Sequence, residues 1–130
     1  MQILNLMTAD PVTVSSRDTL AMAKSIMDTG RFRRTPVVDN GKLVGILTER
    51  DIREHTGYLE STRVDAAMRT ALITVGPGAT VEDAARLMLQ HKIGGLPIVD
   101  EGRLVGIVTT SDLLKAFLNV VQAAGQIMNP

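Results

Sequence analysis

Hydrophobic residues along the chain follow two different periods, and the same succession of periods occurs twice. Short runs rich in β-branched residues at 11–15 and 72–76 favour strands. Each run leads into a segment whose apolar residues recur three and four positions apart, which predicts amphipathic helices at 19–30 and 80–91. A strand followed by a helix is therefore predicted in each half of the chain.

Local signals mark one end of each predicted helix. Gly30 is the expected C-cap of the first helix, because glycine adopts the left-handed conformation at low cost. Thr80 and Asp83 have the spacing of a capping box, in which each side chain satisfies a backbone N–H of the other residue. This spacing predicts that the second helix begins at Thr80.

Two apolar runs separated by a short turn follow each helix. The turn is Asn-Gly at 40–41, a strong hairpin signal, and Glu-Gly at 101–102, where glycine still supplies the permissive position. Further helices are predicted to begin at Thr48 and Thr109. The predicted order in each half is strand, helix, strand, strand, helix.

The two halves are copies of one unit. Shifting the sequence by 61 positions (112 − 51) aligns residues 7–51 with residues 68–112 without a gap, and sixteen of the aligned pairs are identical. A duplication with a fixed period predicts two small units that share one core, since a sheet of so few strands cannot bury enough surface alone. The fold class is therefore α+β, with two β-α-β-β-α repeats packed about a pseudo-twofold axis.

The copies differ in their charged residues. Arg33-Arg34 in the first copy corresponds to Gly94-Gly95 in the second, so only one copy carries two cations before its proline. Likewise Arg50 corresponds to a serine. Arginine presents a fork of N–H donors that matches phosphate oxygens, whereas glycine leaves open space beside which a ligand could lie.

Composition excludes several functional classes. Lys+Arg and Asp+Glu are both 14, so no net field attracts nucleic acid or an anionic membrane, and aromatics at 2% offer few platforms for stacking bases. The chain has no cysteine, no leader-like N-terminus and no apolar run of about 18 residues. We expect a cytoplasmic protein without nucleic-acid or membrane partners.

Neither repeat contains a visible catalytic or metal-binding set. No Ser/His/Asp arrangement, paired carboxylates or P-loop pattern is present, so the sequence predicts neither an enzyme nor a metal site. His55 and His91 have no partner at metal-ligand spacing, and each is interpreted as a surface or capping residue.

The duplicated blocks PVVDNGKLVGILTERD (36–51) and PIVDEGRLVGIVTTSD (97–112) resemble a tandem pair of CBS domains, also called a Bateman module. The resemblance extends from about Leu4 to about Ala124, and the pair is similar to that of acetoin-utilisation-type proteins. On this basis the chain divides into repeat 1 at 1–58, a linker at 59–63, and repeat 2 with a C-terminal helix at 64–130.

The resemblance implies a non-catalytic regulatory module. Such a module binds adenosine-containing ligands (AMP, ADP, ATP or S-adenosylmethionine) between its repeats, needs no other cofactor, and signals to a protein partner through a homodimeric disc. The alternative is a ligand-free structural module for dimerisation or interaction.

The resemblance also implies two clefts, each combining the Gly-x-x-Thr-x-x-Asp motif of one repeat with the segment before the proline of the other. Cleft one would be formed by Val12, Phe32, Arg33, Arg34, Thr109 and Asp112. Cleft two would be formed by Thr48, Arg50, Asp51, Ile73, Ile93, Gly94 and Gly95. The aspartates would accept hydrogen bonds from the ribose, and the unequal cations predict different ligands or one empty cleft.

Each of these assignments has a structural alternative. The Thr-x-x-Asp pairs also have capping-box spacing, and both roles can coexist. Arg33-Arg34 could be a solvated surface pair, and Arg50 could form an ion pair with Glu54 one turn later. Phe32 and Ile93 could either sandwich an adenine or pack in the core.

Overall fold

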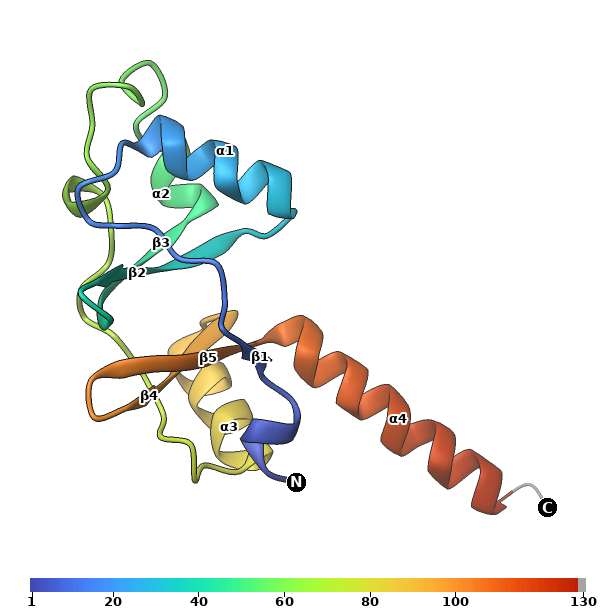
Figure 1. Ribbon diagram of the computed structural model, residues 1–130. Coiled ribbons are helices and arrows are strands. Elements are labelled where there is room, and N and C mark those ends of the chain that lie inside the picture. The colour runs from blue at the N-terminus through green and yellow to red at the C-terminus, as the bar shows by residue number, and fades with distance from the viewer. Residues whose placement is uncertain (129–130) are drawn as a thin grey trace.

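The computed structural model describes residues 1–128, which form two lobes of similar construction (Figure 1). In one lobe lie α1 (Leu20–Gly30), β2 (Arg34–Asp39), β3 (Lys42–Thr48) and α2 (Glu49–Arg53). In the other lie α3 (Val81–His91), β4 (Gly95–Asp100), β5 (Arg103–Thr109) and α4 (Thr110–Met128). The end of the chain predicted to close repeat 2, at 129–130, lies outside the described residues. Within the described residues the α+β fold with a doubled unit is confirmed.

Each lobe is built on an antiparallel hairpin, and the two hairpins face each other between the outer helices α1 and α3 (Figure 1). Both residues of each turn have positive φ, 52° and 80° at 40–41 and 51° and 80° at 101–102. This conformation matches the twist of the flanking strands and confirms the predicted hairpins. Residues Lys42 of β3 and Arg103 of β5 pair, which joins the hairpins into one sheet.

Two local predictions were wrong. The runs at 11–15 and 72–76 do not form strands, because Val14 and Val75 each make only an isolated parallel bridge. Turns follow both runs immediately and leave no length for a ladder. Gly30 is also not the C-cap: it is the last helical residue, and Arg31 adopts the left-handed conformation with φ 57°. Gly30 instead makes room for the ring of Phe32, which a Cβ at this position would overlap.

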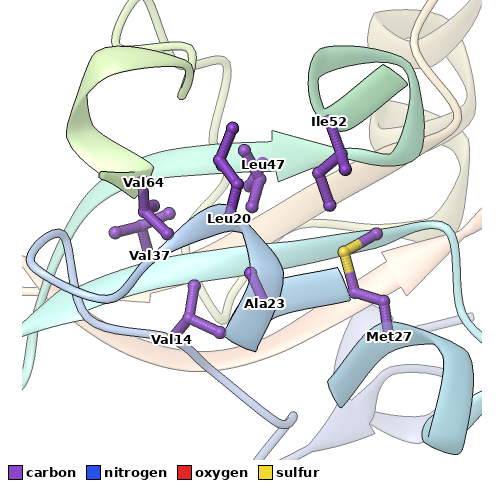
Figure 2. Packing of buried hydrophobic residues seen from close by; sticks show 8 residues of the cluster. All are labelled: Val14, Leu20, Ala23, Met27, Val37, Leu47, Ile52 and Val64. Carbon is purple, nitrogen blue, oxygen red and sulfur yellow. The ribbon is translucent and has the colours of Figure 1, made fainter. Parts of the chain in front are cut away.

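The first helical turn of each repeat packs in the core of the other repeat. The 3-10 helix η1 (Ile3–Asn5) begins repeat 1, yet Ile3 packs in the core of repeat 2 among α3, β4 and β5. The equivalent helix η2 (Val64–Ala66) begins repeat 2, and Val64 packs in the core of repeat 1 beside Val37, as Figure 2 shows. Both side chains are fully buried, so the lobes cannot separate without opening both cores.

The exchanged segments continue along the sheet. After η1, the strand β1 (Thr8–Ala9) pairs with β5 at Ile107 and Gly106. In the other lobe, Arg69 bridges Ile46 of β3 at the equivalent position. Each crossing passes over a glycine: a Cβ at Gly106 would lie 2.8 Å from the carbonyl oxygen of Thr8. Glycine at this position therefore allows the crossing segment to approach.

We predict that Gly106→Ala lowers the free energy of unfolding by about 1–3 kcal/mol, because the new methyl group overlaps backbone that cannot easily move. Gly78→Ala is the matched control, since a Cβ at Gly78 has nothing within 4 Å and the backbone has ordinary dihedral angles. Chemical denaturation compares the two. Equal stability of both variants would show that the crossing is not tightly packed.

Candidate functional site

A cleft of about 830 Å³ lies between segments of the two repeats. One side comes from the segment before β2, and the other from the end of β5 and the first turns of α4. The cleft is lined by all six residues assigned to cleft one: Val12, Phe32, Arg33, Arg34, Thr109 and Asp112. The structure thus brings these residues together, while their contact with a ligand stays a prediction.

Asp112 caps α4 and still has one oxygen available. The backbone N–H and the hydroxyl of Thr109 donate to Asp112 Oδ2 at 2.8 and 3.1 Å, and the Asp112 N–H donates to Thr109 Oγ1 at 3.3 Å. The capping interpretation is therefore confirmed. Within residues 1–128, Oδ1 of Asp112 accepts no hydrogen bond, and the half-buried side chain lines the cleft. Capping and ligand binding can coexist at this carboxylate.

The opposite side of the cleft carries unpaired positive charge. Arg34 is half-buried, and its burial lowers the pKa of the guanidinium, an effect to which the charge of Arg33 adds. In the described part of the chain Arg34 has no ion pair, and Arg33 has only a 3.9 Å contact with Glu49 between exposed side chains. Such an exposed pair contributes little. A half-buried cation without an acidic partner favours an anionic ligand.

Two further cations line the same cleft, Arg31 and Lys115. Sequence reasoning missed both, although each had a signal. Arg31 immediately precedes Phe32, which was assigned to the cleft. Lys115 lies three residues after Asp112, and this spacing places Lys115 and Asp112 on the same face of α4. Asp112 is the only carboxylate among the lining residues, so four cations face one anion.

The side chain of Arg34 takes the space that a Cβ would need at Gly94 and Gly95. A Cβ at Gly94 would lie 2.7 Å from Nη1 of Arg34, and one at Gly95 would overlap Cδ of the same side chain. Gly94 lines cleft one beside Arg34, whereas the sequence assigned it to cleft two, and ligand contact at either glycine stays a prediction. Arg34 and Gly95 are equivalent positions in the two repeats (34 + 61 = 95). The side chain of Arg34 lies where a side chain at position 95 would begin.

Cleft two is arranged differently around its aspartate. The N–H and hydroxyl of Thr48 donate to Asp51 Oδ2 at 3.0 and 2.8 Å, which confirms the capping box of α2. The other oxygen, Oδ1, accepts from Nε of Arg69 at 3.4 Å, and Asp51 is only 6% exposed. Both carboxylate oxygens of Asp51 are thus engaged within the chain.

The other residues assigned to cleft two are Arg50, Ile73 and Ile93, and their contact with a ligand stays a prediction. Arg50 is exposed, and in the described residues it does not form the ion pair with Glu54 that the sequence offered as an alternative. Ile73 and Ile93 pack against the core of repeat 2, and for Ile93 this agrees with the core-packing alternative. Phe32, equivalent to Ile93, packs against its own core and also lines cleft one.

The two histidines lie outside cleft one. His55 Nδ1 lies 2.9 Å from the carbonyl oxygen of Asp51, four residues earlier, and His91 is the exposed last residue of α3. Both positions agree with their interpretation as surface or capping residues. No helix in residues 1–128 is long and apolar enough to cross a membrane.

Comparison with known proteins agrees with this doubled architecture. The family model described as CBS domain matches residues 3–57 and again 64–119. The chain belongs to the CBS-domain family. Among its relatives, the CBS domain-containing protein YhcV of Bacillus subtilis is 42% identical over 114 residues, which are 85% of this chain and 81% of YhcV.

Solved CBS structures share the fold over nearly the whole chain. AcuB of Vibrio cholerae, ascribed to acetoin utilization, superposes with a TM-score of 0.86 at 34% identity, covering 97% of this chain and 96% of AcuB. The CBS pair of protein MJ0100, solved with 5′-methylthioadenosine and S-adenosyl-L-methionine, has a TM-score of 0.84 at 30% identity over 92% of this chain and 97% of that one. CBSX2, solved with AMP, has a TM-score of 0.81 at 25% identity over the same shares.

Proposed function

We propose that this protein is a non-catalytic regulatory module that binds a phosphorylated adenosine ligand, AMP or a related nucleotide, in cleft one. The observation that carries the proposal is the half-buried Arg34, without an acidic partner in the described residues, in the same cleft as the available Oδ1 of Asp112. A nucleotide supplies what each group lacks: phosphate oxygens for the guanidinium and hydroxyl donors for the carboxylate. The adenosine ligands of MJ0100 and CBSX2 support this ligand class.

Each part of the ligand has a matching part of the cleft. The ribose hydroxyls donate to Asp112, and the phosphate lies among Arg33, Arg34 and Lys115. The ring of Phe32 offers an apolar surface to the adenine. Hydrogen bonds to charged groups contribute about 1.5–3 kcal/mol each, so the charged residues dominate the affinity.

The charge of the cleft distinguishes between adenosine ligands. Four cations and one carboxylate line it, and S-adenosylmethionine carries a sulfonium cation into that field. The cations of the cleft attract an anionic phosphate and repel the sulfonium. The preferred ligand is therefore a nucleotide rather than S-adenosylmethionine or the uncharged 5′-methylthioadenosine.

We predict that Asp112→Asn raises the dissociation constant for AMP about 10- to 100-fold, because the ribose hydroxyls lose a charged acceptor. Asp83→Asn is the matched control: Asp83 forms the same capping box with Thr80, at the start of α3, and does not line the cleft. Both variants should lose about 1 kcal/mol of stability or less. Isothermal titration and thermal unfolding measure the two effects separately.

The alternative, a structural module, makes the opposite prediction for this pair. If Asp112 only caps α4, Asp112→Asn and Asp83→Asn behave alike, and AMP, ADP and ATP leave the melting temperature of the wild-type protein unchanged. A ligand at about 100 times its dissociation constant stabilises the native state by about 2.7 kcal/mol. The absence of this stabilisation would therefore be readily detected as an unchanged melting temperature.

The second part of the proposal is a homodimer formed through α4. This helix extends away from the lobes (Figure 1) and exposes an apolar stripe at positions spaced three and four apart: Leu114, Phe117, Leu118 and Val121. Residues 116–128 include no charged side chain, so two copies meet without like-charge repulsion. This supports a second copy as the partner, and the dimer offers a route by which ligand binding affects assembly.

We predict that Phe117→Glu converts the dimer to a monomer, because it places two like charges inside the apolar contact. Asn119→Glu adds the same charge on the opposite side of α4 and should leave the dimer intact. Sedimentation equilibrium measures the mass of both. A monomeric wild-type protein, or a dimer that survives Phe117→Glu, would rule out α4 as the interface.

A further inference from the structure

Positions 8 and 69 are equivalent points of the two crossing segments (8 + 61 = 69). Thr8 pairs with Ile107 of β5, and Arg69 bridges Ile46 of β3. The second bridge is held by two backbone hydrogen bonds, of 3.0 Å from the Ile46 N–H and 2.8 Å from the Arg69 N–H. The two side chains therefore start from matching places on the sheet, each in the repeat opposite its own.

Because the side chains of Thr8 and Arg69 differ in length, Asp112 and Asp51 have different surroundings. Arg69 reaches Asp51 and donates from Nε to Oδ1, the oxygen that the Thr48 cap leaves unused. Thr8 is short and lines cleft one, where Oδ1 of Asp112 is unused in the described residues. Asp51 is buried, whereas Asp112 is half-buried.

Arg34 increases the contrast. Its side chain lies over Gly94 and Gly95, which the family resemblance assigned to cleft two, and it lines cleft one together with Gly94. One arginine thus adds charge to the first cleft and covers two glycines that the sequence assigned to the second. Of the two arginines, 34 and 69, only Arg69 contacts Asp51, the aspartate assigned to cleft two.

We infer that Arg69 closes cleft two to nucleosides, so that the chain holds one adenosine ligand and keeps a latent second ribose site at Asp51. The guanidinium occupies the carboxylate oxygen that would accept the ribose hydroxyl donors. Which side chain stands at position 8 or 69 then decides which cleft is open. The ligand class rests on the proposed function, while the closure rests on the Arg69–Asp51 contact alone.

Exchanging the two side chains tests this inference. Arg69→Thr copies the residue of the open cleft and should expose Asp51, which adds a second AMP site. That site should be weaker, because its assigned residues include a single cation, Arg50. Thr8→Arg should pair with Asp112 and abolish AMP binding. Isothermal titration with AMP counts the sites in each variant.

Arg63→Thr is the matched control, since it removes another exposed arginine with a carboxylate partner, Asp65, at the same cost in net charge. It should bind AMP as the wild type does. Arg69→Val, whose β-branched side chain suits the bridge to Ile46, is a second opening variant should Arg69→Thr fail to fold. Thermal unfolding without ligand identifies the folded variants.

The outcomes separate the inference from the proposed function. One AMP site in the wild type and two in the opening variants support both. No AMP site in the wild type but one in Arg69→Thr supports the closure and overturns the assignment of cleft one. Two sites in the wild type, or no gain in a folded opening variant, overturns the closure.

Discussion

The cleft depends on the exchange of first turns between the repeats. Ile3 completes the core of repeat 2 and Val64 completes the core of repeat 1, and both are fully buried. Burying one such side chain contributes about 1.5–3 kcal/mol, so neither repeat retains a complete core by itself. The same crossings bring Thr8 and Arg69 beside the strands of the opposite repeat. The distance between the two sides of the cleft is therefore set by core packing rather than by a flexible hinge.

Packing near the pseudo-twofold axis accounts for the unequal cations. Residues 34 and 95 are equivalent and touch each other, so two arginines there would place two long side chains and two like charges in one space. Gly95 allows Arg34 to take that space. The presence of an arginine at position 34 and a glycine at position 95 is thus consistent with the packing of the two repeats against each other.

The parts that the sequence could predict are local or repeated. The hairpin turns at 40–41 and 101–102 and the capping boxes at Thr48 and Thr109 involve neighbouring residues, and the duplication doubles each signal. The six residues of cleft one followed from a family resemblance carried onto matching positions. Their roles in ligand binding stay predictions.

The parts that could not be predicted depend on contacts between distant segments. Nothing near Arg69 in the sequence indicates Asp51, 18 positions earlier, because the contact requires the crossing segment to reach β3. The placement of Arg34 over Gly95 likewise requires both lobes. The wrong C-cap has a local origin instead: the ring of Phe32, two residues later, needs the space beside Gly30, and Arg31 adopts the left-handed conformation.

The central claim is that the cations of cleft one select a phosphorylated adenosine. The most direct measurement is the ratio of the dissociation constants of adenosine and AMP, in the wild type and in the double variant Arg33→Ala with Arg34→Ala. The account predicts that AMP binds the wild type at least about tenfold tighter than adenosine, since one charge-assisted hydrogen bond is worth about 1.5–3 kcal/mol. This advantage should largely disappear in the double variant, while adenosine binding changes little. Equal affinity of the wild type for both ligands, or an AMP advantage that survives the double variant, would contradict the account.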